Sequence, residues 1–189
     1  MDDEEFELLK EIVKRGNKRH ASFWEGSNKE QKELGVVQDF CKSMDWEVKC
    51  ESNTQDPPDC TCRDEKEELI GFEVTELVDQ KILEKNVGKS KKVNISEVYR
   101  DWRGGEVVEA LEEILARKDS KIFKGGPYKK LILIIHNDEL GLDEDEVRNT
   151  LKNYQFNATN QIDEAYLLLS YRSNVYPSYP VISLEFRGQ

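Results

Sequence analysis

Two acidic residues stand in short segments with the alternating pattern of β-strands, and together they could hold a metal ion. Asp59 opens one such segment, and Glu73 lies in a second one fourteen residues later. The charged residues 63–68 between the segments predict a turn. If the chain folds back symmetrically about Lys66, Asp59 lies opposite Glu73, and facing residues of a hairpin bring their Cβ atoms to about 5 Å. Two carboxylates at that distance repel each other unless a cation lies between them, and a hard divalent ion such as Mg²⁺ or Mn²⁺ takes such oxygen ligands.

Each carboxylate also has a purely structural interpretation. Asp59 follows two prolines and could cap a turn. Glu73 could be a solvated residue of an antiparallel sheet with one wet face. The residues by themselves favour this structural interpretation over a metal site.

The elements around these residues predict an α/β fold. Apolar residues at helical spacing predict helices at 4–15, 106–118 and 144–154, and a helix of about 17 residues that opens with a capping box at Ser27 and Glu30. Alternating or continuous apolar runs predict strands at 46–50, 59–62, 70–75, 131–135, 165–171 and 181–186. The run 131–135 is wholly apolar, which predicts a central strand buried on both faces. We expect a single domain over residues 1–189, with an N-terminal helix at 4–15 and a core at about 28–186.

The composition limits the class of protein. Charged residues make up 35% of the 189 residues, and no apolar run approaches the ~20 residues of a membrane helix. The first five residues are acidic apart from Met1, which is the wrong sign for a secretory signal. We therefore expect a cytoplasmic protein with no membrane partner.

The four cysteines do not form a recognisable metal motif. Cys41, Cys50, Cys60 and Cys62 include no CxxC pair, and the chain has two histidines. We interpret the cysteines as small apolar residues of the core rather than as a zinc site or a disulfide.

The charge is unevenly distributed along the chain. The net charge of −11 argues against a general nucleic-acid binder. Residues 81–130, however, carry 13 basic and 8 acidic side chains, a net charge of +5. This basic segment could bind phosphate groups, or it could be a solvated lysine-rich face.

The pattern Pro58-Asp59 followed by Glu73-Val74-Thr75 resembles the motif of the PD-(D/E)XK nuclease superfamily. With the order of the elements around it, the resemblance covers about residues 28–136. It implies a restriction-endonuclease-like three-layer core, with a central mixed β-sheet flanked by helices. It also implies that Asp59, Glu73 and the backbone carbonyl of Val74 hold Mg²⁺ or Mn²⁺ in a nuclease that hydrolyses phosphodiester bonds in DNA, which the basic segment 81–130 could bind.

The sequence departs from the motif at one position. The lysine expected two residues after the glutamate is Thr75, whose hydroxyl brings no charge. Some variants of the superfamily supply the lysine from a neighbouring helix. The replacement candidates that follow the hairpin are Lys81, Lys89, Lys91 and Lys92.

The resemblance also implies a glutamate from the helix that precedes the first strand. Glu30 and Glu33 are both candidates, and helical periodicity does not choose between them. Either could instead be a surface charge, and Glu30 could be engaged in the capping box.

Two other functions remain open. The missing lysine and the acidic charge suit a non-catalytic relative of this superfamily that serves as an interaction or regulatory module with a basic protein partner. An unrelated α/β binding domain with an accidental motif is the third alternative. Many nucleases of this superfamily pair to cut both strands, so a homodimer is compatible with the resemblance.

Overall fold

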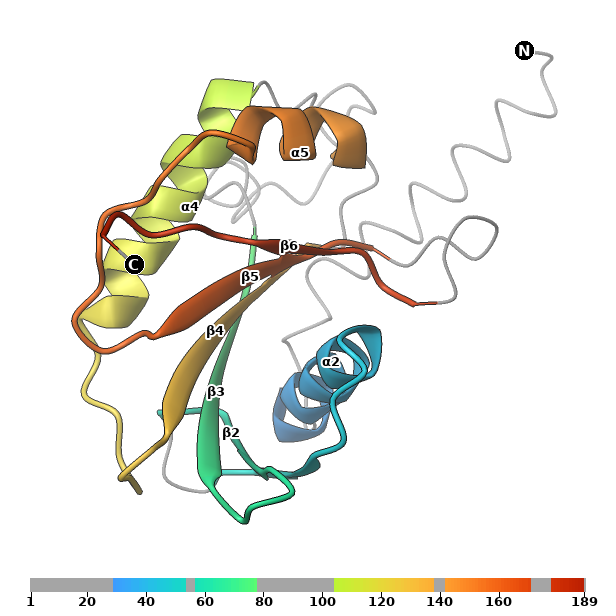
Figure 1. Ribbon diagram of the computed structural model, residues 1–189, viewed down its shortest axis with the longest axis vertical. Coiled ribbons are helices and arrows are strands. Elements are labelled where there is room, and N and C mark those ends of the chain that lie inside the picture. Colours follow the sequence, from blue (N-terminus) through green and yellow to red (C-terminus); the bar gives the residue numbers. More distant parts are fainter. Residues whose placement is uncertain (1–28, 54–56, 78–103, 138–141, 171–177, 189) are drawn as a thin grey trace, which may run out of the picture.

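The computed structural model describes residues 29–53, 57–77, 104–137, 142–170 and 178–188 (Figure 1). The helix expected at 4–15 lies outside these residues. So do Lys81, Lys89, Lys91 and Lys92, the candidates for a replacement lysine.

One mixed sheet of six strands forms the centre of the described structure, and its strands follow one another in chain order. The strands are β1 (Lys49–Ser52), β2 (Cys60–Arg63), β3 (Leu69–Glu76), β4 (Lys130–His136), β5 (Glu164–Leu168) and β6 (Val181–Ser183). The first three are antiparallel, β4 runs parallel to both β3 and β5, and β6 returns antiparallel to β5. All but the first residue of β4 are buried, as its apolar sequence predicts.

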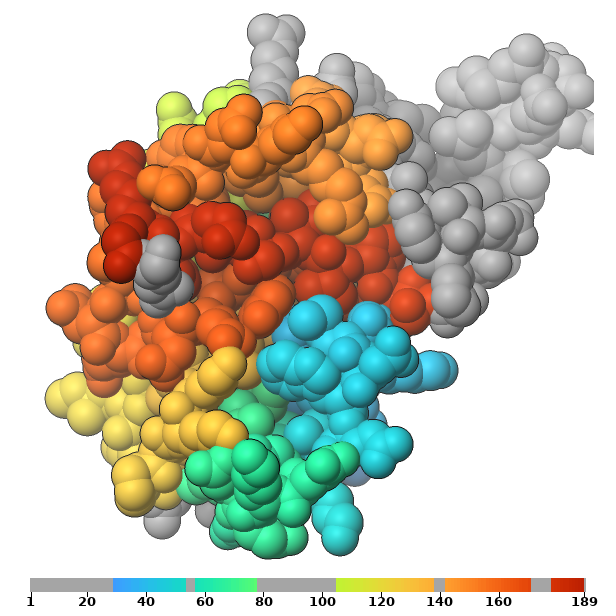
Figure 2. Space-filling model, in the orientation of Figure 1, coloured from blue at the N-terminus to red at the C-terminus, as the bar shows by residue number. Residues whose placement is uncertain are grey.

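Helices cover both faces of this sheet, which gives three layers. Helix α2 (Lys29–Ser43) lies on one side, and helices α4 (Gly104–Asp119) and α5 (Glu144–Leu151) lie on the other (Figure 1). Alternate residues of β4 divide between the two cores: Ile132 and Ile134 pack in the α2 cluster, and Leu133 in the α4 cluster. In the space-filling view the side chains of α2 lie directly against those of the β2–β3 hairpin (Figure 2). The expected α/β class with a mixed sheet flanked by helices is confirmed.

Three strands are shorter than the sequence predicts, and one of them is β5, which ends at Leu168 instead of residue 171. The backbone N–H of Trp46 donates to the carbonyl of Cys41, which extends the turn after α2, and Asp45 has a positive φ of 52°. The ring of Trp46 packs edge-on against Phe40, and β1 begins at Lys49. At the other end of the chain, β6 stops at Ser183, and Phe186 forms an isolated parallel bridge with Phe156.

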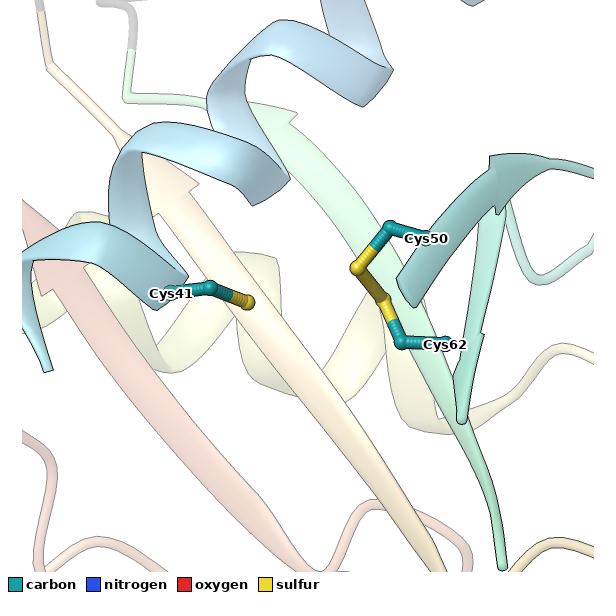
Figure 3. Close-up of side chains that lie close together, drawn as sticks. All are labelled: Cys41, Cys50 and Cys62. Atoms are coloured by element: carbon teal, nitrogen blue, oxygen red, sulfur yellow. A yellow bond between two sulfur atoms is a disulfide. The ribbon is translucent and has the colours of Figure 1, made fainter. Parts of the chain in front are cut away.

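The expectation that all four cysteines are reduced core residues is wrong. Cys50 of β1 and Cys62 of β2 are direct partners in the antiparallel ladder, and they form a disulfide (Figure 3). Cys41 and Cys60 are free and buried, as expected. Sequence could not show the disulfide, because the two cysteines become neighbours only through the register of β1 against β2.

The disulfide closes a loop with a sequence separation of 12 residues. Replacing both Cys50 and Cys62 with alanine is therefore expected to lower the free energy of unfolding by about 3 kcal/mol, because the unfolded chain loses a constraint. Urea unfolding of the oxidised proteins measures this difference. The difference should nearly disappear in a reductant, and a variant as stable as the oxidised wild type would contradict the prediction.

None of the helices among the described residues has the length and apolar character needed to cross a membrane.

Candidate metal centre

The β2–β3 hairpin brings the two predicted carboxylates together. Cys60 pairs with Phe72 in the ladder, so Asp59, the residue before β2, falls in register with Glu73. One carboxylate oxygen of Asp59, Oδ2, accepts a hydrogen bond of 2.7 Å from the backbone N–H of Val74. Asp59 is 5% exposed and Glu73 is fully buried, so Glu73 is not the solvated strand residue of the structural interpretation.

Glu73 lies on the face of the sheet that α4 covers. Its neighbour in β4 is Leu133, which packs in the same cluster as Leu111 and Leu115 of α4. A carboxylate in such an apolar layer needs a cation, because an unpaired buried charge is costly. The cation comes from the end of α4 and from the residues just after it.

Two lysines meet one oxygen of Glu73. The Nζ atoms of Lys118 and Lys121 lie 2.5 Å and 2.7 Å from Oε1. Lys118 also donates to the carbonyl oxygen of Val74 at 3.1 Å. The second carboxylate oxygen of Glu73, Oε2, is buried and has no hydrogen-bond partner among the described residues.

Lys118 is the residue of this cluster that the sequence prediction missed. It is 6% exposed, and burial holds the pKa of its ammonium below the usual range, although the nearby Glu73 carboxylate counteracts this shift. Its position continues the buried stripe of Leu111 and Leu115 by one further turn. The signal available in the sequence was a lysine that falls on the apolar stripe of a helix.

The structure distinguishes between the two helix glutamates. Glu33 is 4% exposed, and Lys29 approaches both Glu33 Oε1 at 3.2 Å and Asp59 Oδ1 at 4.0 Å. Glu30 is exposed, and its described contact is through its backbone carbonyl, which accepts from the hydroxyl of Ser52. Glu33 therefore belongs to the carboxylate cluster, and the structure does not bring Glu30 into it.

Burial and like charge both act on Asp59. Burial is the largest cause, and together with the Glu73 and Glu33 carboxylates, against the opposing effects of the Val74 N–H and Lys118, it raises the pKa of Asp59 to about 7. Near neutral pH, protonated and ionised Asp59 are thus both populated. A proton or a cation relieves the same repulsion.

Thr75, at the position of the motif lysine, is 9% exposed. Thr75 lies two residues after Glu73 on β3, so both side chains are on the same face of the sheet. Its partner in β4 is Ile135, which packs in the α4 cluster. It contributes a hydroxyl but no charge. The positive charge next to Glu73 is supplied by Lys118 and Lys121.

The donor types of this cluster are those that a hard divalent cation takes. Asp59, Glu73 and Glu33 offer carboxylate oxygens and Val74 offers a backbone carbonyl, but the ligand atoms of the three carboxylates do not all lie within 4.8 Å of one another. Oxygen-only donor sets suit Mg²⁺ and Mn²⁺. Oε2 of Glu73 is a buried acceptor that lacks a donor among the described residues, and a cation would satisfy it.

The described part of the basic segment 81–130 holds much of its charge in ion pairs. Lys129 contacts Asp64 and Glu68 of the hairpin turn, and Lys130 contacts Glu164. Lys118 and Lys121 face Glu73. These lysines are therefore engaged with carboxylates before any phosphate group arrives.

Comparison of the chain with models of known protein families, with curated proteins and with solved structures finds no match.

Proposed function

We propose that this protein is a metal-dependent nuclease with a restriction-endonuclease-like core, and that it hydrolyses phosphodiester bonds in DNA. The observation that carries the proposal is the position of Lys118. From α4 it reaches both Glu73 and the carbonyl of Val74, and so it supplies the cation that Thr75 lacks. The three-layer α/β architecture and the paired hairpin carboxylates support the same function.

Each residue of the cluster has a role in this proposal. Asp59, Glu73 and the carbonyl of Val74 would hold Mg²⁺ or Mn²⁺, which when bound neutralises phosphate charge and lowers the pKa of a bound water. The buried ammonium of Lys118 would stabilise the negative charge that develops on the scissile phosphate. Lys121 has a side chain that is 35% exposed, so it can face an arriving substrate.

Protonation of Asp59 should control ion binding. Because the pKa of Asp59 is raised to about 7, its proton competes with the ion in the neutral range. Ion affinity should therefore increase from about pH 6 to about pH 8.

A second function is favoured by the two lysines on Glu73. Together they already balance its buried charge without a metal ion. A relative of the same fold that has lost activity could retain this arrangement for stability alone. With a net charge of −11, such a protein would suit a basic protein partner.

Calorimetry and a cleavage assay together test the nuclease. We expect the wild type at about pH 8 to bind one Mn²⁺ per chain, and Asp59→Ala to lose at least about ten-fold in affinity, since a direct ligand is removed. Asp64→Ala is the matched control, because Asp64 is an acidic residue of the same hairpin that caps its turn. Plasmid DNA should be cut by the wild type with Mn²⁺ or Mg²⁺, and a chelator should stop the reaction.

A folded wild type that binds neither ion, with or without DNA, and that leaves DNA intact would contradict the nuclease proposal. It would favour the non-catalytic module. Sedimentation of the same samples, with and without DNA, would show whether the chain forms a homodimer.

A further inference from the structure

A second cluster, separate from the carboxylates, consists of three cysteines from three elements. Cys41 lies on α2, Cys50 on β1 and Cys62 on β2. Their three sulfur atoms all lie within 4.8 Å of one another. The sulfur of Cys41 points from the helix toward the Cys50–Cys62 disulfide (Figure 3).

We propose that reduction of the Cys50–Cys62 disulfide converts these three cysteines into a site for a thiophilic divalent metal ion, of which Zn²⁺ is the biological example. The disulfide and the metal site exclude each other, because both use the sulfurs of Cys50 and Cys62. The oxidised form links β1 to β2, and the reduced form would link α2, β1 and β2 through the ion.

The spacing of the sulfurs suits one ion. Zn–S bonds are about 2.3 Å long, so thiolates around a single Zn²⁺ stand roughly 4 Å apart. The sulfur of Cys41 lies within 4.8 Å of the other two, and the sulfurs of Cys50 and Cys62, which are bonded to each other in the oxidised form, must move apart by about 2 Å after reduction. Side-chain rotations of the three cysteines can supply these movements. No fourth Cys, His, Asp or Glu of the described residues joins this group.

Charge and access favour a divalent ion with a water as fourth ligand. Three thiolates with a divalent ion leave a net charge of −1, whereas a monovalent ion would leave −2 among buried side chains, which costs more. Zinc sites with three protein ligands commonly keep a water in the fourth position. Cys41 and Cys62 are buried, but Cys50 is partly exposed, so water and a reductant can reach the cluster from that side.

The chemistry balances in two steps. A dithiol reductant gives two electrons and two protons to the disulfide, which yields two thiols while the reductant becomes a disulfide. The ion then binds three thiolates and releases three protons to the solvent. Burial raises the pKa of the Cys41 thiol to about 12, and direct coordination displaces such a proton, so binding should weaken as the pH falls.

Absorption spectroscopy tests the site directly. The full-length chain is reduced with a phosphine under nitrogen, freed of the phosphine and titrated with Cd²⁺ and with Co²⁺. We expect thiolate-to-metal charge-transfer bands that saturate at one ion per chain, and competition by Zn²⁺. These bands report thiolate ligands only, so an ion bound at the Asp59 and Glu73 carboxylates does not contribute to them.

Two variants and the oxidised protein make the test specific. Cys41→Ser should lower the affinity at least about 100-fold, because a direct ligand is lost. Cys60→Ser is the matched control, since Cys60 is, like Cys41, a buried free cysteine. It lies on β2 with Cys62 but outside the group of three sulfurs, so this variant should bind the ion like the wild type. The oxidised protein, which keeps its disulfide, should show no saturating band.

Thermal unfolding gives a second readout that does not depend on colour. Zn²⁺ should raise the Tm of the reduced wild type and of Cys60→Ser but not of Cys41→Ser. Absence of a saturating band in the reduced wild type, or equal affinity in Cys41→Ser, would overturn the proposal. A reduced chain that unfolds still tests it, because Zn²⁺ should then restore the fold of the wild type only when Cys41 is present.

Discussion

Replacing Lys118 with methionine is expected to lower the rate of metal-dependent DNA cleavage by about 100- to 1,000-fold. Methionine keeps the length and apolar stem of the side chain, but it removes the ammonium that contacts Glu73 and the Val74 carbonyl. Since the proposed metal ligands remain, calorimetry should still detect Mn²⁺ binding. A loss of rate with metal binding retained would separate the role of Lys118 from that of Asp59.

The change in the free energy of unfolding of Lys118→Met can also be predicted. Lys121 still contacts Glu73 at 2.7 Å, so the buried carboxylate keeps one cation. We expect the free energy of unfolding to fall by about 2–3 kcal/mol, less than for a buried pair that loses its only cation. Circular dichroism during urea unfolding measures this change and shows that the variant is folded under the assay conditions.

Lys129→Met is the matched control for Lys118→Met. Lys129 is a half-exposed lysine that pairs with Asp64 and Glu68 away from the metal centre. Its loss should leave the cleavage rate within about two-fold and the free energy of unfolding within about 0.5 kcal/mol. If Lys118→Met cuts DNA as fast as the wild type does, Lys118 has no part in the chemistry and the proposed function loses its main support.

The paired carboxylates could be predicted because strands impose short-range rules. In a hairpin the register follows from the turn, and side chains alternate with a period of two, so one correct turn places Asp59 opposite Glu73. The central strand β4 was equally accessible, since a continuous apolar run has few alternatives to burial on both faces. Both predictions need only residues that are near in sequence or extreme in composition.

The cation at the site was not predicted, because it depends on how α4 docks. Lys118 and Glu73 are 45 residues apart, and no local pattern records that the last turn of α4 lies over β3. Which of Glu30 and Glu33 is buried depends on the side of α2 that faces the sheet. The packing of α2 against the sheet determines this orientation, and the helix sequence alone does not. The sequence analysis placed the replacement lysine among the basic residues that follow the hairpin, such as Lys91, which lies outside the described residues.

Replacing Asp59 with asparagine is expected to stabilise the protein at pH 8 by about 2–4 kcal/mol while it weakens metal binding. The pKa of Asp59 is raised from 3.8 to about 7, first by burial and then by Glu73. Asparagine has nearly the same shape and can still accept the Val74 N–H, but it does not ionise. The variant thus removes the cost of a buried negative charge and also removes a proposed metal ligand.

The pH dependence gives this prediction its sign. Below about pH 4 Asp59 is protonated in both the folded and the unfolded chain, so the two proteins should be equally stable. Between about pH 4 and pH 7 only the unfolded chain has ionised Asp59, so the stability of the wild type falls relative to the variant as the pH rises. Above about pH 7 the difference should be constant, and urea unfolding at a series of pH values without divalent ions measures it.

Asp64→Asn and added Mg²⁺ complete the test. The pKa of Asp64 is lowered by the Glu68 backbone N–H, by Lys129 and by the Lys66 backbone N–H. Asp64→Asn should therefore lower the free energy of unfolding above about pH 4 or leave it unchanged. At pH 8, Mg²⁺ should raise the free energy of unfolding of the wild type but not that of Asp59→Asn. The ion neutralises the buried Asp59 carboxylate, which the variant lacks. If Asp59→Asn is less stable than the wild type at pH 8 without ions, the carboxylate is already stabilised by its protein neighbours. The metal centre would then have no unmet charge for an ion to neutralise.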